Sequence, residues 1–312
     1  MSVGPANYRS PFKVQPLFRE RIWGRGDLAP FFPSAPASDT KRIGEAWFTS
    51  EENLTESGKT LGEILHAHPE MLGSAADPEH PFICPLLLKL IFTTERLSVQ
   101  VHPDDAYAKL HHGTLGKTEA WYVVDAEPDA EIAVGLNQPV QGDQFREAIR
   151  TGHIEKLLAW HKVKPGDTVL VPAGTVHAIG AGIIVCEVQE NSDITYRLWD
   201  YGRPRELHID HGAAVARREP YKFQPQATPL DAERDELTHS MYFRMERLRP
   251  RTCIHIPAEL PYYLLLMSVH GAQAGTFWFV PAGSDEFVIE DSGAEWVLAY
   301  KAYAPLKRLV IE

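Results

Sequence analysis

Short runs of Val, Ile, Leu and Phe, bounded by Gly, Pro, Asn or Asp, recur along the whole chain. Runs of this kind are typical of strands joined by tight turns. A buried strand is predicted from Pro85 to Phe92, because that segment is almost continuously apolar. Further strands are predicted at 21–24, 43–47, 98–102, 116–124, 169–171 and 183–189, with another beginning at His177. The pattern indicates a mainly β protein.

Helical spacing of apolar residues occurs in only three places. The pattern predicts helices at 61–72, interrupted at Pro69, at 143–158 and at 206–217. In the last of these, His208 and His211 are interpreted as surface histidines rather than as a second metal site, because Asp210 lies beside them. A few helices therefore accompany the strands.

A weak internal repeat suggests two units of unequal size. The segment Val171-Pro172-Ala173-Gly174 recurs as Val280-Pro281-Ala282-Gly283, and each copy follows a predicted strand. Residues 219–238 are polar and charged, with prolines. We expect a first domain at 1–220, a linker at 221–238 and a smaller second domain at 239–312. In the second copy Glu286 takes the place of His177.

Composition and charge restrict the partners. The formal net charge of −11 argues against nucleic acid or an anionic membrane as the main partner, but it permits a small anionic substrate. The N-terminus has no apolar signal-like stretch, and no later run approaches membrane-spanning length. Three scattered cysteines, in no C-x-x-C pattern, favour a reduced and cytoplasmic protein.

Alternation in the 98–102 strand places Ser98, Gln100 and His102 on one face. Taken alone, this is typical of a solvated edge strand. If the face is buried, its polar groups need partners, and a metal ion is one such partner. Together with Glu119 and His177, Gln100 and His102 offer two imidazole nitrogens and two oxygens. That donor set suits catalytic zinc, with manganese, cobalt or nickel as other occupants. The alternative is two separate structural histidines.

One segment resembles a motif of a known fold, and three others resemble a known family. The turn-strand-turn-His segment at 166–177 resembles a cupin motif. The segments Leu97-Ser-Val-Gln-Val-His-Pro-Asp, Gly116-Lys-Thr-Glu-Ala-Trp-Tyr-Val and Asn191-Ser-Asp with Arg197 resemble short bacterial type I mannose-6-phosphate isomerases. The resemblance extends from Trp23 to His208. It implies two cupin barrels (double-stranded β-helix barrels), the second smaller and without a metal.

The resemblance also implies roles for individual residues. Gln100, His102, Glu119 and His177 would hold one Zn²⁺ per chain. Arg197 would act in catalysis, and Lys117 and Ser98 would lie at the phosphate end of the substrate. Lys117 and Arg197 are the cations available to a sugar phosphate. From the residues alone, Lys117 could equally be a solvated turn lysine and Arg197 half of a surface ion pair.

The activity implied is the interconversion of mannose 6-phosphate and fructose 6-phosphate through an enediolate. Such a reaction needs a base that moves a proton between two carbons. Glu187 is the first candidate, with Glu190 and a metal-bound water as alternatives, and Glu187 could instead be a structural partner of a cation. Two other functions stay open, namely a metal-dependent cupin oxygenase and a non-catalytic sugar-binding bicupin.

Overall fold

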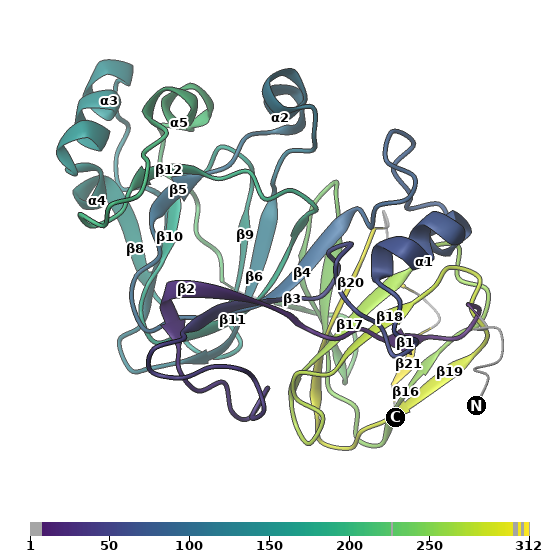
Figure 1. Cartoon of the computed structure of the whole chain (residues 1–312). Helices are drawn as coiled ribbons and strands as arrows, with labels where there is room; N and C mark the ends of the chain where they lie inside the picture. The colour runs from purple at the N-terminus through teal and green to yellow at the C-terminus, as the bar shows by residue number, and fades with distance from the viewer. Residues whose placement is uncertain (1–7, 226, 302–304, 307–308, 312) are drawn as a thin grey trace.

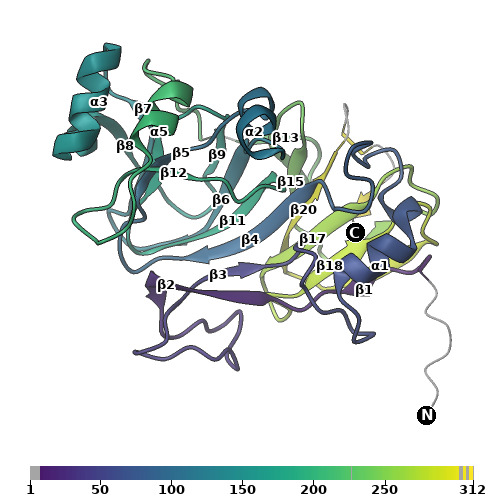
Figure 2. The same ribbon diagram turned by 45° about the horizontal axis from the view of Figure 1, so that its top comes forward.

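The structure is a computed structural model that describes residues 8–225, 227–301, 305–306 and 309–311. Residues 1–7, where the sequence predicts no signal segment, lie outside the described ranges. So does Glu312, the last residue of the expected second domain. Four β-sheets stack face to face (Figures 1 and 2). Helices cover the outer face of the five-stranded sheet at one end of the stack. The expectation of a mainly β protein with few helices is confirmed.

The first half of the chain forms a sandwich of two sheets. The five-stranded sheet has the order β12-β5-β10-β7-β8, with bounds Tyr196–Trp199, Val99–Val101, His177–Ile179, Glu131–Leu136 and Leu158–Lys162. The six-stranded sheet has the order β2-β3-β4-β11-β6-β9, with bounds Leu17–Arg25, Ile43–Trp47, Leu86–Phe92, Ile183–Glu190, Glu119–Ala126 and Thr168–Val171.

The second half adds two more sheets. The seven-stranded sheet has the order β1-β18-β17-β20-β15-β14-β13, with bounds Phe12–Lys13, Phe277–Val280, Leu264–His270, Glu295–Tyr300, Arg244–Leu248, Arg234–His239 and Thr228–Pro229. The three-stranded sheet has the order β19-β16-β21, with bounds Phe287–Glu290, Cys253–Ile256 and Val310–Ile311. None of these sheets closes on itself, so the two-barrel description stays an expectation.

Strand alternation explains why the sheets stack. In β4, Leu88 and Leu90 pack toward the seven-stranded sheet in one large core, whereas Ile91 packs toward the five-stranded sheet. In β17, Leu265 joins the same large core and Leu266 packs toward the three-stranded sheet. The two inner sheets therefore bury apolar residues on both faces, and the large core joins the two halves of the chain.

The helices are short. Their bounds are Leu61–Ala67 for α1, Asp105–His112 for α2, Gly142–Thr151 for α3, Ile154–Leu157 for α4 and Ile209–Val215 for α5, with a 3₁₀ turn η1 at Pro69–Leu72. The break expected at Pro69 is confirmed. The single helix predicted at 143–158 is wrong, because Gly152 takes a left-handed conformation and ends α3, and Leu158 already begins β8. The helix predicted at 206–217 is confirmed over the shorter range of α5.

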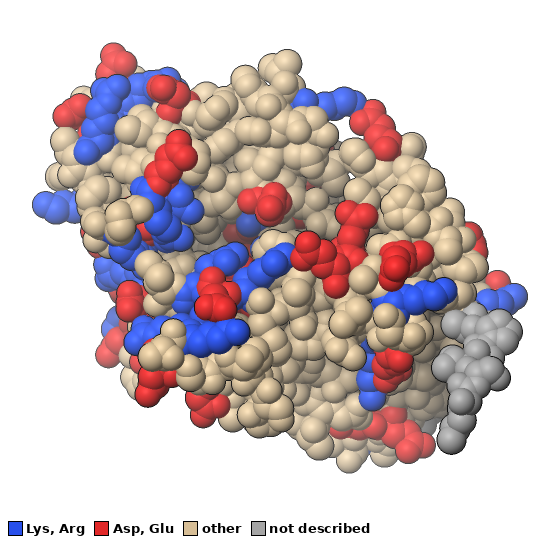
Figure 3. Space-filling view, in the orientation of Figure 1, with Lys and Arg blue, Asp and Glu red and all other residues tan. Residues whose placement is uncertain are grey.

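No helix within the described ranges is both long and apolar enough to cross a bilayer. Lys and Arg side chains gather mostly over the first half of the chain in the space-filling view, although the formal net charge is −11 (Figure 3). Positive charge is thus concentrated locally on an acidic protein.

Candidate metal centre and active site

Three predicted metal ligands meet inside the first sandwich. His102 follows directly after β5, Glu119 begins β6 and His177 begins β10. The Nε2 atom of His102 lies 3.3 Å from Glu119 Oε2, and the Nε2 atom of His177 lies 3.2 Å from Glu119 Oε1. Each of the three residues is only 1% exposed. Segments far apart in the sequence therefore place three donor groups around one buried point.

The hydrogen bond at Nδ1 of each ring determines which tautomer the histidine adopts. The Nδ1 atom of His102 lies 2.9 Å from the Ile194 carbonyl oxygen, and that of His177 lies 2.9 Å from the Thr175 carbonyl oxygen. Because a carbonyl only accepts, each Nδ1 carries a hydrogen and donates it. In neutral rings both Nε2 atoms then present lone pairs toward the Glu119 carboxylate.

This arrangement fits a cation. Within the described part of the chain, both Nε2 atoms and both Glu119 oxygens lack a hydrogen-bond partner. Burial and the positive charge of Lys117 lower the pKa of His102 to about 3, and burial lowers that of His177. Burial alone would raise the pKa of Glu119, but the charges of Lys117, His102 and His177 hold it well below its ordinary value. Neutral imidazoles beside a carboxylate are the ligand state that zinc requires.

Gln100, the predicted fourth ligand, lies on the strand next to His177. It lies in β5, where its Cα is paired with His177 on one side and with Arg197 on the other. Its side chain lines a cavity of about 510 Å³. A cavity of this size can hold a small molecule such as a sugar phosphate. Lys117 lines the same cavity and its Nζ lies 3.2 Å from Glu119 Oε2, so the centre is next to a substrate-sized pocket.

Glu187 faces the same pocket within a buried network. Its Oε1 atom lies 3.2 Å from Lys89 Nζ, and its Oε2 atom accepts a hydrogen bond of 2.8 Å from Trp121 Nε1. Burial and the negative charge of Glu119 raise the pKa of Glu187 above its ordinary value. Each oxygen keeps a second lone pair, so the carboxylate can still accept a proton. Among the described residues that line the pocket, Glu187 is present and Glu190 is not.

Lys89 was not predicted as a site residue. Its Nζ also donates to Gln189 Oε1 at 2.5 Å and lies over the Trp47 ring, and burial lowers its pKa. A signal was present in the sequence, because Lys89 is the one charged residue in the apolar run of β4. Alternation turns it away from the large core and toward the pocket.

Lys117 lies beside the metal centre. Its Nζ is 3.2 Å from Glu119 Oε2, and the residue is 5% exposed, so it is not a solvated turn lysine. Although burial alone would lower its pKa, the charges of Glu119 and Glu187 raise it. Lys117 therefore stays a cation at the end of the pocket where Glu119 lies.

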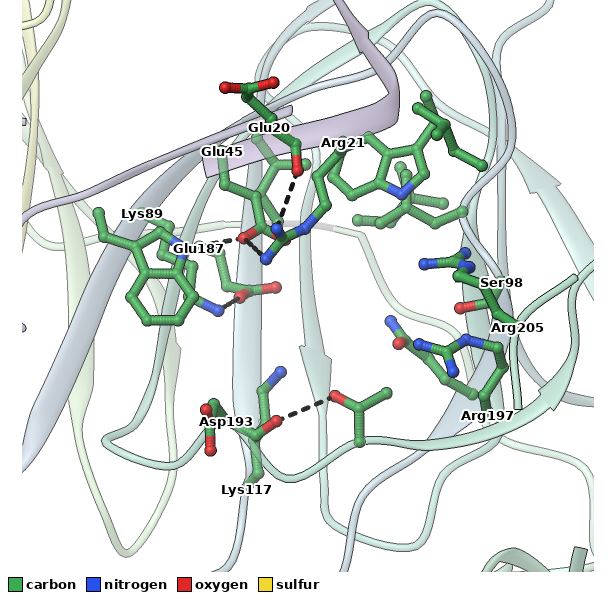
Figure 4. A pocket seen from close by; sticks show the side chains of 18 residues that line it. Glu20, Arg21, Glu45, Lys89, Ser98, Lys117, Glu187, Asp193, Arg197 and Arg205 are labelled. Atoms are coloured by element: carbon green, nitrogen blue, oxygen red, sulfur yellow. Dashed lines mark hydrogen bonds and ion pairs between the residues drawn. The ribbon is translucent and has the colours of Figure 1, made fainter. Parts of the chain in front are cut away.

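Ser98, Arg197 and Arg205 lie on the other side of the pocket from Lys89 and Glu187 (Figure 4). The Arg197 guanidinium donates to the Glu206 carbonyl oxygen at 2.9 Å, and its buried Nε has no hydrogen-bond partner among the described residues. Arg205, which was not predicted, is held by the buried carboxylate of Asp200 at 2.5 and 2.8 Å. These side chains provide a cationic wall.

The fold and this site define a β-sandwich protein with a buried His/Glu/His metal-type centre next to a pocket lined by both cations and carboxylates. A model of the phosphomannose isomerase type I catalytic domain matches residues 11–146. The mannose-6-phosphate isomerase ManA of Bacillus subtilis is 42% identical over 220 residues, which cover 66% of this chain and 67% of the relative. The enzyme of the same name from Streptococcus mutans is 35% identical over 279 residues, covering 84% of this chain and 85% of the relative.

Solved structures agree with the sequence comparisons. The crystal structure of a mannose 6-phosphate isomerase from Bacillus subtilis has a TM-score of 0.82 and 29% identity, and the match covers 93% of this chain and 99% of that one. This chain belongs to the type I mannose-6-phosphate isomerase family.

Proposed function

We propose that this protein is a metal-dependent aldose–ketose isomerase that interconverts mannose 6-phosphate and fructose 6-phosphate. The observation that carries the proposal is a set of buried ligand atoms of His102, Glu119 and His177 without hydrogen-bond partners among the described residues. They lie next to a pocket that is lined by Lys117, Glu187 and Arg197. The names of the relatives point to the same reaction.

We propose that Gln100, His102, Glu119 and His177 hold one Zn²⁺ per chain. Two imidazole nitrogens and two oxygens fit zinc with room for a further ligand. A solved mannose 6-phosphate isomerase of the same fold, 14% identical to this chain, is bound with zinc and yttrium. When bound, the ion supplies Lewis-acid stabilisation of the negative charge that develops on the sugar oxygens during isomerisation.

Within this proposal Glu187 removes a proton from one of the carbons C1 and C2 and returns it to the other. Its raised pKa supports that role, because a general base works best when its pKa is near the working pH. Lys89 and Trp121 orient the carboxylate through one bond to each oxygen. The buried walls of the sandwich exclude water from the proton while it is transferred.

Substrate binding is assigned to Ser98, Lys117 and Arg197. Arg197 and Ser98 would face the phosphate, because they lie together on the cationic side of the pocket (Figure 4). Lys117, 3.2 Å from Glu119, would contact the substrate from the metal side, where a cation also stabilises developing negative charge. Lys117 and Arg197 thus serve both binding and catalysis.

The remaining assignments are part of the same proposal. Residues 1–220 would form the catalytic unit and 239–312 a smaller unit without a metal, joined by 221–238. A cytoplasmic location suits the cysteines Cys84, Cys186 and Cys253, all of which are free thiols. The acidic net charge argues against nucleic acid or an anionic membrane as a partner.

The test is a coupled assay of mannose 6-phosphate turnover on purified protein, before and after chelation and after zinc is restored. Turnover that disappears with the metal and returns with zinc is expected. An oxygen electrode in the same cuvette checks the oxygenase alternative, for which oxygen consumption would be seen instead. Metal and sugar phosphate binding without any turnover would favour the non-catalytic bicupin.

A further inference from the structure

Arg197 lies on an edge strand. β12 is the last strand of the five-stranded sheet. Among the described strands it pairs only with β5, where Arg197 is opposite Gln100. The register shifts between Arg197 and Trp199, so the strand is irregular at this point. An edge strand leaves backbone N–H and C=O groups without a partner in the sheet. The position of Arg197 therefore depends on what occupies that free edge.

His208 pairs with Arg197 at this edge. The Arg197 N–H donates to Nδ1 of His208 at 3.1 Å, and the His208 N–H donates to the Arg197 carbonyl oxygen at 2.8 Å. The His208 imidazole thus takes the place of a strand carbonyl, while its own amide completes a two-bond clamp. The nearby Glu206 carbonyl accepts from the Arg197 guanidinium at 2.9 Å. Both the backbone and the side chain of Arg197 are held by the segment 206–208.

His208 is itself held in place and was wrongly interpreted as a simple surface histidine. Its carbonyl accepts the Gly212 N–H at 2.9 Å at the start of α5, and its ring centroid lies 6.1 Å from that of Tyr196. The charged and titratable groups that face it are Arg197, Glu206 and His211. Burial, with the charge of Arg197, lowers the pKa of His208.

The clamp requires one form of the ring. Because Nδ1 accepts from an N–H, it must carry the lone pair, so the ring must be neutral with its hydrogen on Nε2. A protonated His208 would set its Nδ1–H against the Arg197 N–H, and that bond would be lost. Arg197 would then keep its bonds to the His208 N–H and the Glu206 carbonyl but would lose the bond that fixes its own N–H.

We propose that His208 is a positioning residue that fixes Arg197 in the pocket by accepting its backbone N–H at Nδ1. The inference rests on the proposed function, in which Arg197 contacts the substrate. Misplacing a binding group by about 1 Å can cost on the order of 10²-fold in rate. The edge strand also has β5 as a partner, so a smaller loss of at least ~10-fold in kcat/KM is expected when the acceptor is removed.

The test compares H208L with H208N. The asparagine Oδ1 can occupy the place of Nδ1 and accept the same N–H, whereas leucine cannot accept. We expect H208L to lower kcat/KM for mannose 6-phosphate, with zinc content unchanged, and H208N to keep most of the wild-type value. H211N is the matched control, because His211 lies on the same helix and its Nδ1 is bonded to the Tyr107 hydroxyl instead. That control should behave as wild type.

A pH profile separates positioning from simple stability. As the pH falls, protonation of His208 should raise KM in the wild type but not in H208N, which has no titrating group there. Ionisation of the substrate phosphate is common to both enzymes, so it cancels in the comparison. Identical acid limbs in the two enzymes would overturn the proposal.

Two outcomes of the kinetic comparison would also overturn it, namely wild-type kinetics in H208L and equal losses in H208L and H208N. The ¹⁵N chemical shifts of the His208 ring give a readout that needs no turnover. Nδ1 without a hydrogen is expected at neutral pH, and a protonated Nδ1 would refute the clamp even if H208L does not fold. If the wild type fails to isomerise mannose 6-phosphate while that tautomer is observed, the proposed function fails and the clamp does not.

Discussion

Replacing Glu187 by glutamine separates proton transfer from ion pairing. Glutamine keeps the size of the side chain and one oxygen that can accept from Trp121, but it cannot take up a proton. It also removes the charge that faces Lys89 Nζ at 3.2 Å. The lost charge should lower the stability of the protein, whereas the lost proton acceptor should lower its activity.

The cost in stability follows from the geometry. At 3.2 Å, an effective dielectric constant of about 20 gives an attraction of about 5 kcal/mol. Removing one partner of a buried pair typically costs about 3–5 kcal/mol, because the other charge is left uncompensated. Lys89 keeps its bond to Gln189 and the attraction of Glu45, so the lower end of that range is expected. For a chain of 312 residues this corresponds to a fall in Tm of about 5 °C.

If Glu187 is the general base, Glu187→Gln should also lose most of its activity. A positioned general base contributes roughly 10²–10⁴-fold, so kcat should fall by at least about 10²-fold while KM and zinc content change little. The double variant Glu187→Gln/Lys89→Met removes both charges and should recover the lost Tm without recovering kcat. Exchange of the substrate C2 proton with solvent deuterium is the direct measurement. Near-normal exchange in Glu187→Gln, or recovery of kcat in the double variant, would show that Glu187 is only an ion-pair partner.

Three other variants test separate parts of the site. His177→Ala should lose most of the bound zinc and most activity while the second half of the chain stays folded, and elemental analysis that finds full occupancy would contradict the ligand assignment. Arg197→Ala should chiefly raise KM for mannose 6-phosphate. Unphosphorylated mannose should be a poor substrate of the wild type, so equal turnover of the two sugars would rule out recognition of the phosphate. Glu190→Gln should change the pH dependence of stability, because burial raises the pKa of Glu190 to about 8 in the folded protein from 4.5. Between those values the folded form holds a proton that the unfolded form has lost, so the wild type loses about 1.4 kcal/mol of unfolding free energy per pH unit from this group. The variant should therefore gain stability relative to wild type as the pH rises from about 4.5 to 8, and parallel denaturation profiles would show that the Glu190 carboxyl is not buried in its protonated form.

Local pattern predicted the donor groups of the metal-type cluster, but it left open the alternative of two separate structural histidines. Gln100 and His102 share a strand face by alternation, and Glu119 and His177 each stand at the start of a strand. Residue type and spacing made a metal centre one of two interpretations, because nothing local shows whether these groups are buried. The resemblance to a family then joined segments that no local rule connects.

Partners across the sheets could not be predicted in this way. Lys89 meets Glu187 because β4 pairs with β11, and the pairing of strands nearly a hundred residues apart depends on the whole sheet order. The same holds for His208, because nothing in the sequence indicates that the residue before α5 would clamp an edge strand. The end of α3 at Gly152 is not predicted by the periodicity of apolar residues, because it depends on a backbone conformation. Whether the sheets close into barrels is likewise decided by packing and not by periodicity.

Sequence alone thus determined which strands carry donor groups and on which face, since alternation is a property of each strand by itself. Only the tertiary structure decided which faces are buried and what each charge meets there. The physical reason is that burial cost and Coulomb attraction depend on distance and dielectric environment, and both arise only when the sheets stack. Lys89 and Glu187 pair within one sheet and are buried by that stacking, whereas the Arg197–His208 clamp depends on the chain after β12 returning to the edge of its sheet.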